Sequence, residues 1–177
     1  MIWNGSDVQR QQGLKGQMQT ANAGETLRKY WLSHNLHLNP GVSLAIVREF
    51  ESRFGVLMPS DLLSYFARVN GMPSNETDED LVRFWPLEDV KTIAAGSPGY
   101  SNPAYLPGAK SFFLFADYFI WSHHYAIRLS AKTEEPNLVY IIGYDKPTLV
   151  GESFTQFVDS YINGKHLDIL RSRPLAR

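Results

Sequence analysis

The chain has 177 residues, of which 44% are hydrophobic, 20% charged and 13% aromatic, a composition typical of one globular domain with a hydrophobic core. The formal net charge is −1 and the isoelectric point is near 6.5, so the clustered basic residues that nucleic acids and anionic membranes attract are missing. Cysteine is absent, which excludes a disulfide scaffold, thiol catalysis and cysteine-based zinc sites.

The first 23 residues are polar, rich in Gln and Gly, and follow neither a helical nor a strand period. They predict a flexible or loosely docked arm ahead of a single domain over residues 24–177. We expect no signal peptide and no membrane span, and therefore a cytoplasmic protein, because no apolar segment has the required length and flanks. The arginines of the tail are expected to be solvated rather than to bind nucleic acid; they are Arg171, Arg173 and Arg177.

A first helix is predicted to begin near Glu25, with Leu27, Tyr30 and Trp31 on one apolar stripe. A second helix is predicted after it, with Asn39 as its N-cap and Pro40 as its first residue. Its apolar positions, four residues apart, are Val42, Ile46, Phe50 and Phe54, with Gly55 as the stop.

A third helix is predicted to begin at Pro59 or Ser60, where Asp61 favours the helix dipole. It ends at Asn70-Gly71, and its apolar face consists of Leu62, Leu63, Phe66 and Val69. Because the second and third helices are amphipathic, each must bury one face against the rest of the domain.

Beyond Gly71 the pattern changes to short strands. Aromatic and branched residues predict strands over residues 81–85, 112–119, 125–129 and 138–142. An acidic loop is expected over residues 74–80, a helical turn over 87–93 and a loop over 95–110, with turns at 123–124, 133–137 and 145–147. A closing helix is predicted from Ser153 to Gly164, with Phe154, Phe157, Val158 and Tyr161 on one face. The predicted class is α+β: N-terminal helices and a C-terminal helix packed on one face of a mostly antiparallel sheet.

No catalytic set is evident in the sequence. It contains no phosphate-binding glycine motif, and Ser153 lacks the second glycine of a nucleophile elbow, so it is interpreted as a helix N-cap. Asp117 lies among aromatic residues, where a structural hydrogen bond explains it as well as catalysis does. We therefore expect a protein without enzymatic activity and without a cofactor.

Two histidine pairs were considered as metal ligands. His34 and His37 could share one helix face, whereas His123 and His124 are neighbours, which point apart on a strand. Neither pair has the further ligands of a zinc motif, and the acidic loop lacks the alternating ligands and central glycine of a calcium loop. No metal site is predicted.

The acidic loop has two interpretations. It is either a solvated loop or a negative patch that steers a basic protein partner. As contact residues we consider its four carboxylates together with two tyrosines of the 95–110 loop as aromatic anchors; they are Glu76, Asp78, Glu79, Asp80, Tyr100 and Tyr105.

Several segments together resemble the SUKH superfamily, which includes Smi/Knr-type regulators of fungal cell-wall assembly and bacterial immunity proteins. Residues 46–59 and 61–71 are similar to its opening helices with their Gly, Pro and Asn-Gly landmarks. Residues 84–90, Phe-Trp-Pro-Leu-Glu-Asp-Val, resemble its next strand and Pro-Leu turn, and residues 152–161 its closing helix. Phe115-Ala116-Asp117 and Trp121 lie where a strand pair is expected. The resemblance spans residues 40–163.

This resemblance implies a non-catalytic α+β fold that binds other proteins. The first expectation is an immunity protein that binds and inhibits a cognate polymorphic toxin. A regulatory or scaffold protein of the Smi/Knr type is the second. A small-ligand carrier or an enzyme requires a deep pocket with convergent polar groups. The family landmarks are core and capping residues, so the resemblance transfers the fold and not the contact surface.

Overall fold

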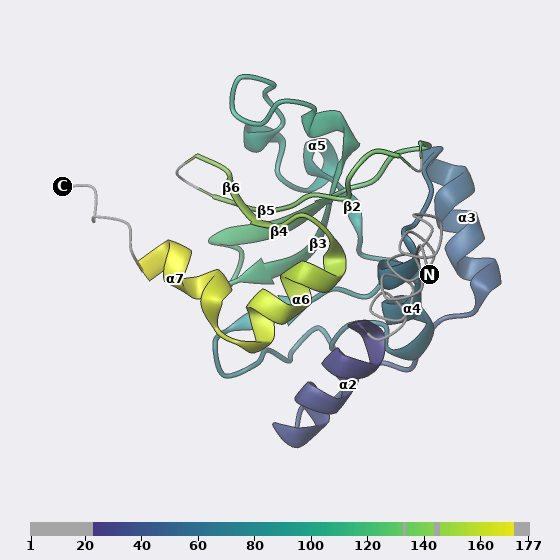
Figure 1. Cartoon of the computed structure of the whole chain (residues 1–177), viewed down its shortest axis with the longest axis vertical. Helices are drawn as coiled ribbons and strands as arrows, with labels where there is room; N and C mark the ends of the chain where they lie inside the picture. Colours follow the sequence, from purple (N-terminus) through teal and green to yellow (C-terminus); the bar gives the residue numbers. More distant parts are fainter. Residues whose placement is uncertain (1–22, 133, 144–145, 172–177) are drawn as a thin grey trace, which may run out of the picture.

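A computed structural model describes residues 23–132, 134–143 and 146–171 of the chain (Figure 1). The predicted N-terminal arm lies outside these residues except for Ala23, which is buried and begins the first helix. Of the tail arginines, only Arg171 is within them, as the last residue of a helix. The described elements are α2 (Ala23–Ser33), α3 (Leu44–Phe54), α4 (Ser60–Arg68), β1 (Val82–Phe84), β2 (Lys91–Thr92), α5 (Ile93–Gly96), η1 (Pro98–Tyr100), η2 (Ala109–Ser111), β3 (Phe112–Tyr118), β4 (His123–Arg128), β5 (Val139–Ile142), β6 (Thr148–Gly151), α6 (Phe154–Ile162) and α7 (Lys165–Arg171).

The strands form one antiparallel sheet in the order β1-β3-β4-β5-β6. The short strand β2 pairs with the N-terminal part of β3, and β1 pairs with its C-terminal part. In Figure 1, helices α2, α4 and α6 lie on one side of this sheet, and α5 lies on the other. The α+β class and the helix-covered antiparallel sheet predicted from the sequence are confirmed.

Each face of the sheet has its own hydrophobic core. The larger core lies under the helices and is rich in aromatic rings, with Trp31, Phe84 and Phe157 fully buried. The smaller core lies under the segment 93–111 on the opposite face and contains Trp85, Phe112 and Leu114. The alternation of side chains along each strand explains this division, because neighbours such as Phe84 and Trp85 point to opposite faces.

Helices α4 and α6 are joined at their N-termini by Asp61. Its carboxylate accepts hydrogen bonds from the backbone N–H of Thr155 at 2.9 Å and from the Thr155 hydroxyl at 3.1 Å. Ser153 caps the same end of α6, since its hydroxyl oxygen accepts from the backbone N–H of Gln156 at 3.1 Å. The N-cap predicted for Ser153 is therefore confirmed. Asp61 lies in the first turn of α4 and also binds the first turn of α6.

The predicted start of the second helix was wrong. Helix α3 begins at Leu44 with Ser43 as its N-cap, and Pro40 instead pairs with Val69 in a single β-bridge. The Asn39 side chain donates to the carbonyl oxygen of Asn70 at 3.0 Å, and its backbone exchanges hydrogen bonds with the 70–71 segment. Long-range pairing with the end of α4 thus overrides the local capping preference of Asn-Pro.

Further corrections concern the apolar stripe of α3 and the later elements. Val47 is buried in place of Ile46, which is 48% exposed. The helical turn expected over residues 87–93 contains strand β2, and the loop expected over 95–110 contains short helical turns. The turn expected at residues 123–124 is the start of β4, and strand β6 and helix α7 were not predicted. The described helices include none long and apolar enough to cross a membrane.

Candidate protein-binding surface

The acidic loop, residues 74–80, runs between α4 and β1 and is fixed to the core by Asp78. The backbone N–H of Val82 donates to Oδ1 of Asp78 at 2.7 Å, and the backbone N–H of Asp78 donates to the Val82 carbonyl oxygen at 3.0 Å. The Tyr161 hydroxyl donates to Oδ2 of the same carboxylate. Asp78 is only 8% exposed, so this member of the predicted contact set lies inside the protein and holds the loop in place.

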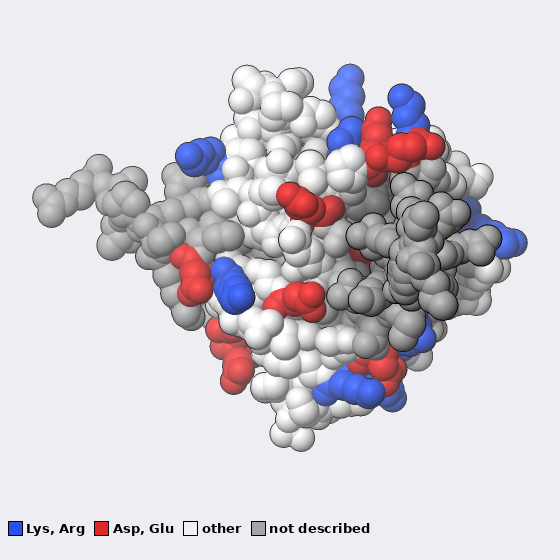
Figure 2. Space-filling model, viewed as in Figure 1, with Lys and Arg blue, Asp and Glu red and all other residues white. Residues whose placement is uncertain are grey.

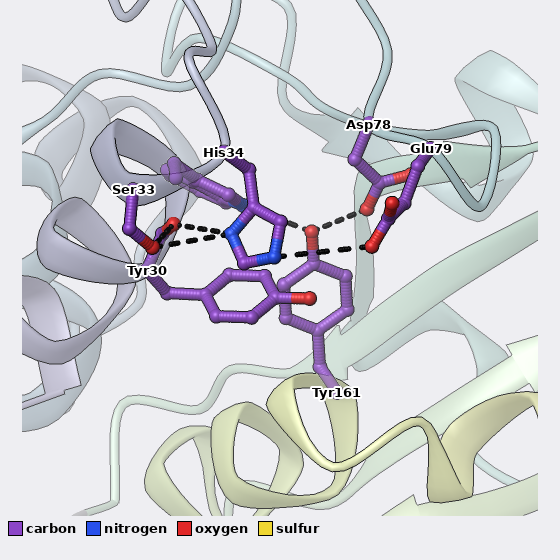
Figure 3. Close-up of polar contacts among 7 residues, drawn as sticks. Tyr30, Ser33, His34, Asp78, Glu79 and Tyr161 are labelled. Carbon is purple, nitrogen blue, oxygen red and sulfur yellow. Dashed lines mark hydrogen bonds and ion pairs between the residues drawn. The ribbon is translucent and has the colours of Figure 1, made fainter.

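Tyr161 completes a buried chain of hydrogen bonds. Figure 3 shows its ring reaching from α6 toward Asp78, and its oxygen also accepts from the Trp31 indole N–H at 2.8 Å. Burial raises the pKa of Tyr161 well above its ordinary value, with a further contribution from the Asp78 charge. Burial also raises the pKa of Asp78, although the hydrogen bonds from Tyr161 and Val82 oppose this effect. The tyrosine therefore remains the proton donor, and the contact links α2, α6 and the acidic loop.

The two N-terminal histidines face carboxylates of the acidic loop. Nε2 of His34 lies 3.8 Å from Oε1 of Glu79 (Figure 3), and Nδ1 of His37 lies 3.0 Å from Oε2 of Glu76. The backbone N–H of His37 also donates to Glu76 at 3.1 Å, and this hydrogen bond is the main cause of the lowered pKa of that carboxyl group. Helix α2 ends at Ser33, so the two histidines do not share a helix face as considered.

The other carboxylates of the acidic loop differ in exposure. The Glu79 side chain is 71% exposed, and Asp80 is half-buried beside it. On the face drawn in Figure 2, acidic and basic side chains are interspersed, with uncharged surface between them. Glu79 and Asp80, with Glu76 next to His37, thus form a local negative patch whose shape is set by Asp78 beneath it.

The two predicted aromatic anchors lie elsewhere. Tyr100 and Tyr105 are half-buried and pack against each other with ring centres 5.2 Å apart over the smaller core. The Tyr105 hydroxyl donates to the Gly143 carbonyl oxygen at 2.9 Å and accepts from the Gly143 N–H at 3.1 Å. The structure therefore does not bring these tyrosines together with the acidic loop, which is attached to the helical side of the sheet.

The structure shows an exposed apolar surface that was not predicted from the sequence. We define the hairpin tip as Phe119, Ile120 and Trp121, which connect β3 to β4 and are 54%, 82% and 49% exposed. Leu81, 41% exposed, adjoins it, because the Phe119 N–H donates to the Leu81 carbonyl oxygen at 3.0 Å. The sequence pattern predicted that strand β3 continues through Phe119. The signal available was the apolar run 118–121, which enters a hairpin without Gly, Asn or Asp.

The backbone of the hairpin tip is strained. Phe119, Ile120 and Trp121 have φ values of 50°, 49° and 68°, and Leu81 has 63°. For residues other than glycine this left-handed region costs roughly 1–2 kcal/mol each, and branched residues such as Ile are rarely found there. Strain of this kind persists where surrounding contacts determine it, and it is concentrated at functional sites.

Asp117 supplies one of these contacts. Its carboxylate accepts from the Trp85 indole N–H at 2.5 Å and from the backbone N–H of Trp121 at 3.4 Å. The Trp121 ring lies 5.2 Å from that of Trp85, and the Lys91 ammonium group lies 5.8 Å from the Trp121 ring centre. Of the two explanations left open for Asp117, the structure provides the first: hydrogen bonds to a turn.

A ligand-binding cavity finds little support in the described part of the chain. One hollow of about 490 Å³ is open and lies between β6 and α6. Its charged lining residues are all exposed, so they do not converge on an enclosed site as a ligand pocket requires; they are Glu152, Asp159 and Lys165. Among the described residues, no three His, Asp or Glu side chains are grouped to bind a metal ion.

The fold places the protein among small α+β domains with helices on one face of an antiparallel sheet. Over residues 41–160, more than half of the chain, it matches the SMI1 / KNR4 family (SUKH-1), and the chain belongs to this family. The resemblance found in the sequence is thereby confirmed. No individual curated protein matches the chain. Helices α2 and α7 lie outside the matched range, so His34 and His37 belong to a part that the family pattern does not cover.

Proposed function

We propose that the protein is an immunity protein of the SUKH type, which binds a cognate toxin domain and blocks its activity. Family membership carries this proposal, because it gives the fold, and the sequence resemblance extends to bacterial immunity proteins. The acidic loop adds a physical rationale. The exposed Glu79 and the half-buried Asp80 belong to a loop that the buried contact between Asp78 and Tyr161 holds in place, so their positions are set before a partner arrives.

The proposed partner presents a basic surface to the acidic loop. Toxins that act on nucleic acids have such surfaces, since they must attract phosphates. Opposite charges accelerate the encounter more than they stabilise the final complex. A regulatory or scaffold role, as in Smi/Knr-type proteins, is the second candidate. The family match supports this role as much as the immunity role, because both kinds of protein share the fold. Genomic neighbours distinguish the two, because an immunity gene adjoins its toxin gene.

The test is co-expression with the toxin domain encoded beside the gene. The full chain is expected to restore growth and to co-purify with the toxin. Reversing two charges of the acidic loop, Glu79→Lys with Asp80→Lys, is expected to slow association about 10-fold or more at low salt, with a smaller effect at high salt. The control is Glu49→Lys with Asp159→Lys, which makes the same charge change on exposed positions of α3 and α6.

The outcomes separate the proposal from its alternatives. If the wild-type chain neither protects cells nor binds the adjacent toxin, the immunity function is wrong. If it binds but both charge variants slow association equally, the contact surface does not include the acidic loop.

A further inference from the structure

The hairpin tip carries the two most exposed large apolar side chains of the described chain, those of Ile120 and Phe119. Ile120 is 82% exposed and Phe119 54%, whereas the same hairpin buries Phe113, Phe115 and Tyr125. Isolated exposed apolar residues are ordinary, but here three consecutive ones lie at the end of a hairpin and a fourth lies beside them. The fourth is Leu81, hydrogen-bonded to Phe119 through its carbonyl oxygen.

The conformation of the tip is fixed before any partner binds. Hydrogen bonds close the turn at both ends, from the Ser122 N–H to the Phe119 carbonyl oxygen at 3.2 Å and from the Ser122 hydroxyl to the Tyr118 carbonyl oxygen at 3.1 Å. Trp121 is held against Trp85 by ring packing and by its N–H bond to Asp117. Three consecutive left-handed residues thus keep Phe119 and Ile120 pointing away from the core. A rigid apolar projection loses little conformational entropy on binding.

The tip is continuous with the acidic loop. Leu81 directly follows Asp80, and its backbone N–H donates to the Asp78 carbonyl oxygen at 3.1 Å. The apolar patch is therefore bordered by Glu79 and Asp80 beside Leu81 and by the Lys91 ammonium group beside Trp121. The two carboxylates disfavour insertion of the Leu81 side into an anionic membrane, whose headgroups carry the same sign of charge. They also disfavour a symmetric dimer through the tip, because the two acidic borders would then approach each other.

We propose that the hairpin tip and Leu81 form the apolar centre of the partner interface, and that the partner is a protein with an apolar pocket bordered by basic residues. This inference rests on the proposed function, because the partner is the same toxin domain. It assigns the main contribution to affinity to Phe119 and Ile120, and the contribution to association rate to the acidic border. Interfaces commonly divide these roles between a buried apolar centre and a charged rim.

The experiment measures the Kd of the complex between the full chain and the adjacently encoded toxin domain. The tip variant is Phe119→Ser with Ile120→Ser, and Trp121 is left unchanged because it packs on Trp85. The matched control is Leu44→Ser with Leu149→Ser, two leucines that are 50% and 41% exposed on other elements. We expect the tip variant to weaken binding about 100-fold, mainly through faster dissociation, and the control to change it less than about 3-fold. Circular dichroism and urea unfolding verify that both variants are folded.

Flotation with vesicles of phosphatidylcholine and phosphatidylserine, and sedimentation of the free chain, complete the test. If the tip variant binds the toxin as tightly as the control does, the inference is wrong while the proposed function stands. Flotation or dimerisation of the wild type that is lost in the tip variant also overturns it, in favour of a membrane or a second copy. If the wild-type chain does not bind the toxin at all, both the inference and the proposed function fail.

Discussion

Tyr161 of α6 donates a buried hydrogen bond to Asp78, and this contact joins α6 to the acidic loop. The same tyrosine oxygen accepts from Trp31 of α2. One phenol thus satisfies a buried carboxylate and a buried indole, two groups that cost free energy when left without partners. The position of the negative patch on the surface depends on this interior contact.

Replacing Tyr161 with Phe is expected to reduce the free energy of unfolding by about 2–3 kcal/mol, because Asp78 and Trp31 each lose a hydrogen bond. The hydrogen bond from Tyr161 lowers the pKa of Asp78, so its loss raises that pKa further. The destabilisation should therefore be smaller near pH 4, where more of the unpaired carboxyl group is neutral. Urea unfolding at pH 7 and pH 4 measures both effects.

Tyr140→Phe is the control for this variant. Tyr140 is half-buried on the opposite side of the sheet, and its hydroxyl has no hydrogen-bond partner within the residues that the structure describes. It should change the free energy of unfolding by less than about 0.5 kcal/mol. Equal effects of the two substitutions would show that the Tyr161 hydroxyl makes no special contribution.

The contact between Glu76 and His37 predicts a pH-dependent contribution to stability. The pKa of Glu76 is lowered in the folded protein, chiefly by the backbone N–H of His37. A lowered carboxyl pKa means that the stabilisation is fully present above the ordinary Glu value of about 4.3 and is lost as the pH falls through the folded-state value. Glu76→Gln should thus destabilise the protein by about 1 kcal/mol or less at pH 7, and its difference from the wild type should shrink toward pH 3.

Thermal unfolding of both proteins between pH 3 and pH 7 measures this difference. Glu49→Gln on the exposed face of α3 serves as the control, since it removes a carboxylate without removing the contact to His37. A wild-type advantage over Glu76→Gln that stays constant across this range would contradict the assigned cause.

The strained backbone of the hairpin tip predicts that a glycine there stabilises the protein. Ile120 has a φ of 49° and a side chain that is 82% exposed, so glycine relieves strain there and removes little packing. Ile120→Gly should increase the free energy of unfolding by about 1 kcal/mol. The same substitution at Ile46, which is exposed in the first turn of α3, should instead decrease it by about 0.5–1 kcal/mol, because glycine disfavours helix. Urea unfolding compares the two, and a loss of stability in both would show that the tip is not strained.

The sequence was sufficient for the features that depend on local pattern. Runs of aromatic and branched residues located β3, β4 and β5, and the helix signals located α4 and α6 within one or two residues. Ser153 was recognised as a cap because its role requires only the next three residues. The family assignment followed from the order of such landmarks, which are core and capping positions.

The features that were missed depend on contacts between distant residues. Asn39 carries a strong capping signal, yet its partners are Asn70 and Gly71, more than 30 positions away. Asp78 was placed on the surface because its neighbours are acidic, and only the fold brings Tyr161 to it. Tyr100 and Tyr105 could not be separated from the acidic loop without knowing which face of the sheet the 95–110 segment covers.

Glycine is required for different reasons at Gly55 and Gly71: for its backbone conformation at the first, and also for its lack of a side chain at the second. Gly55 and Gly71 both have a positive φ, 64° and 68°; Gly55 is the C-cap of α3, whereas Gly71 lies beyond the end of α4 at Arg68. A Cβ atom at Gly55 would meet nothing within 4 Å, whereas at Gly71 it would lie 2.5 Å from the backbone carbon of Trp85. Gly55→Ala should therefore reduce the free energy of unfolding by about 1–2 kcal/mol, the usual cost of alanine in the left-handed conformation. Gly71→Ala should cost more than about 4 kcal/mol, because the strand leading to Pro86 must move.

Urea unfolding of the two alanine variants tests this directly, and a cost for Gly71→Ala equal to that for Gly55→Ala would contradict it. The close approach at Gly71 explains why glycine follows Asn70 in the segment after α4. Asn70 accepts the Leu87 N–H at 2.7 Å, and only a residue without a side chain lets the chain pass beside Trp85 to make that contact.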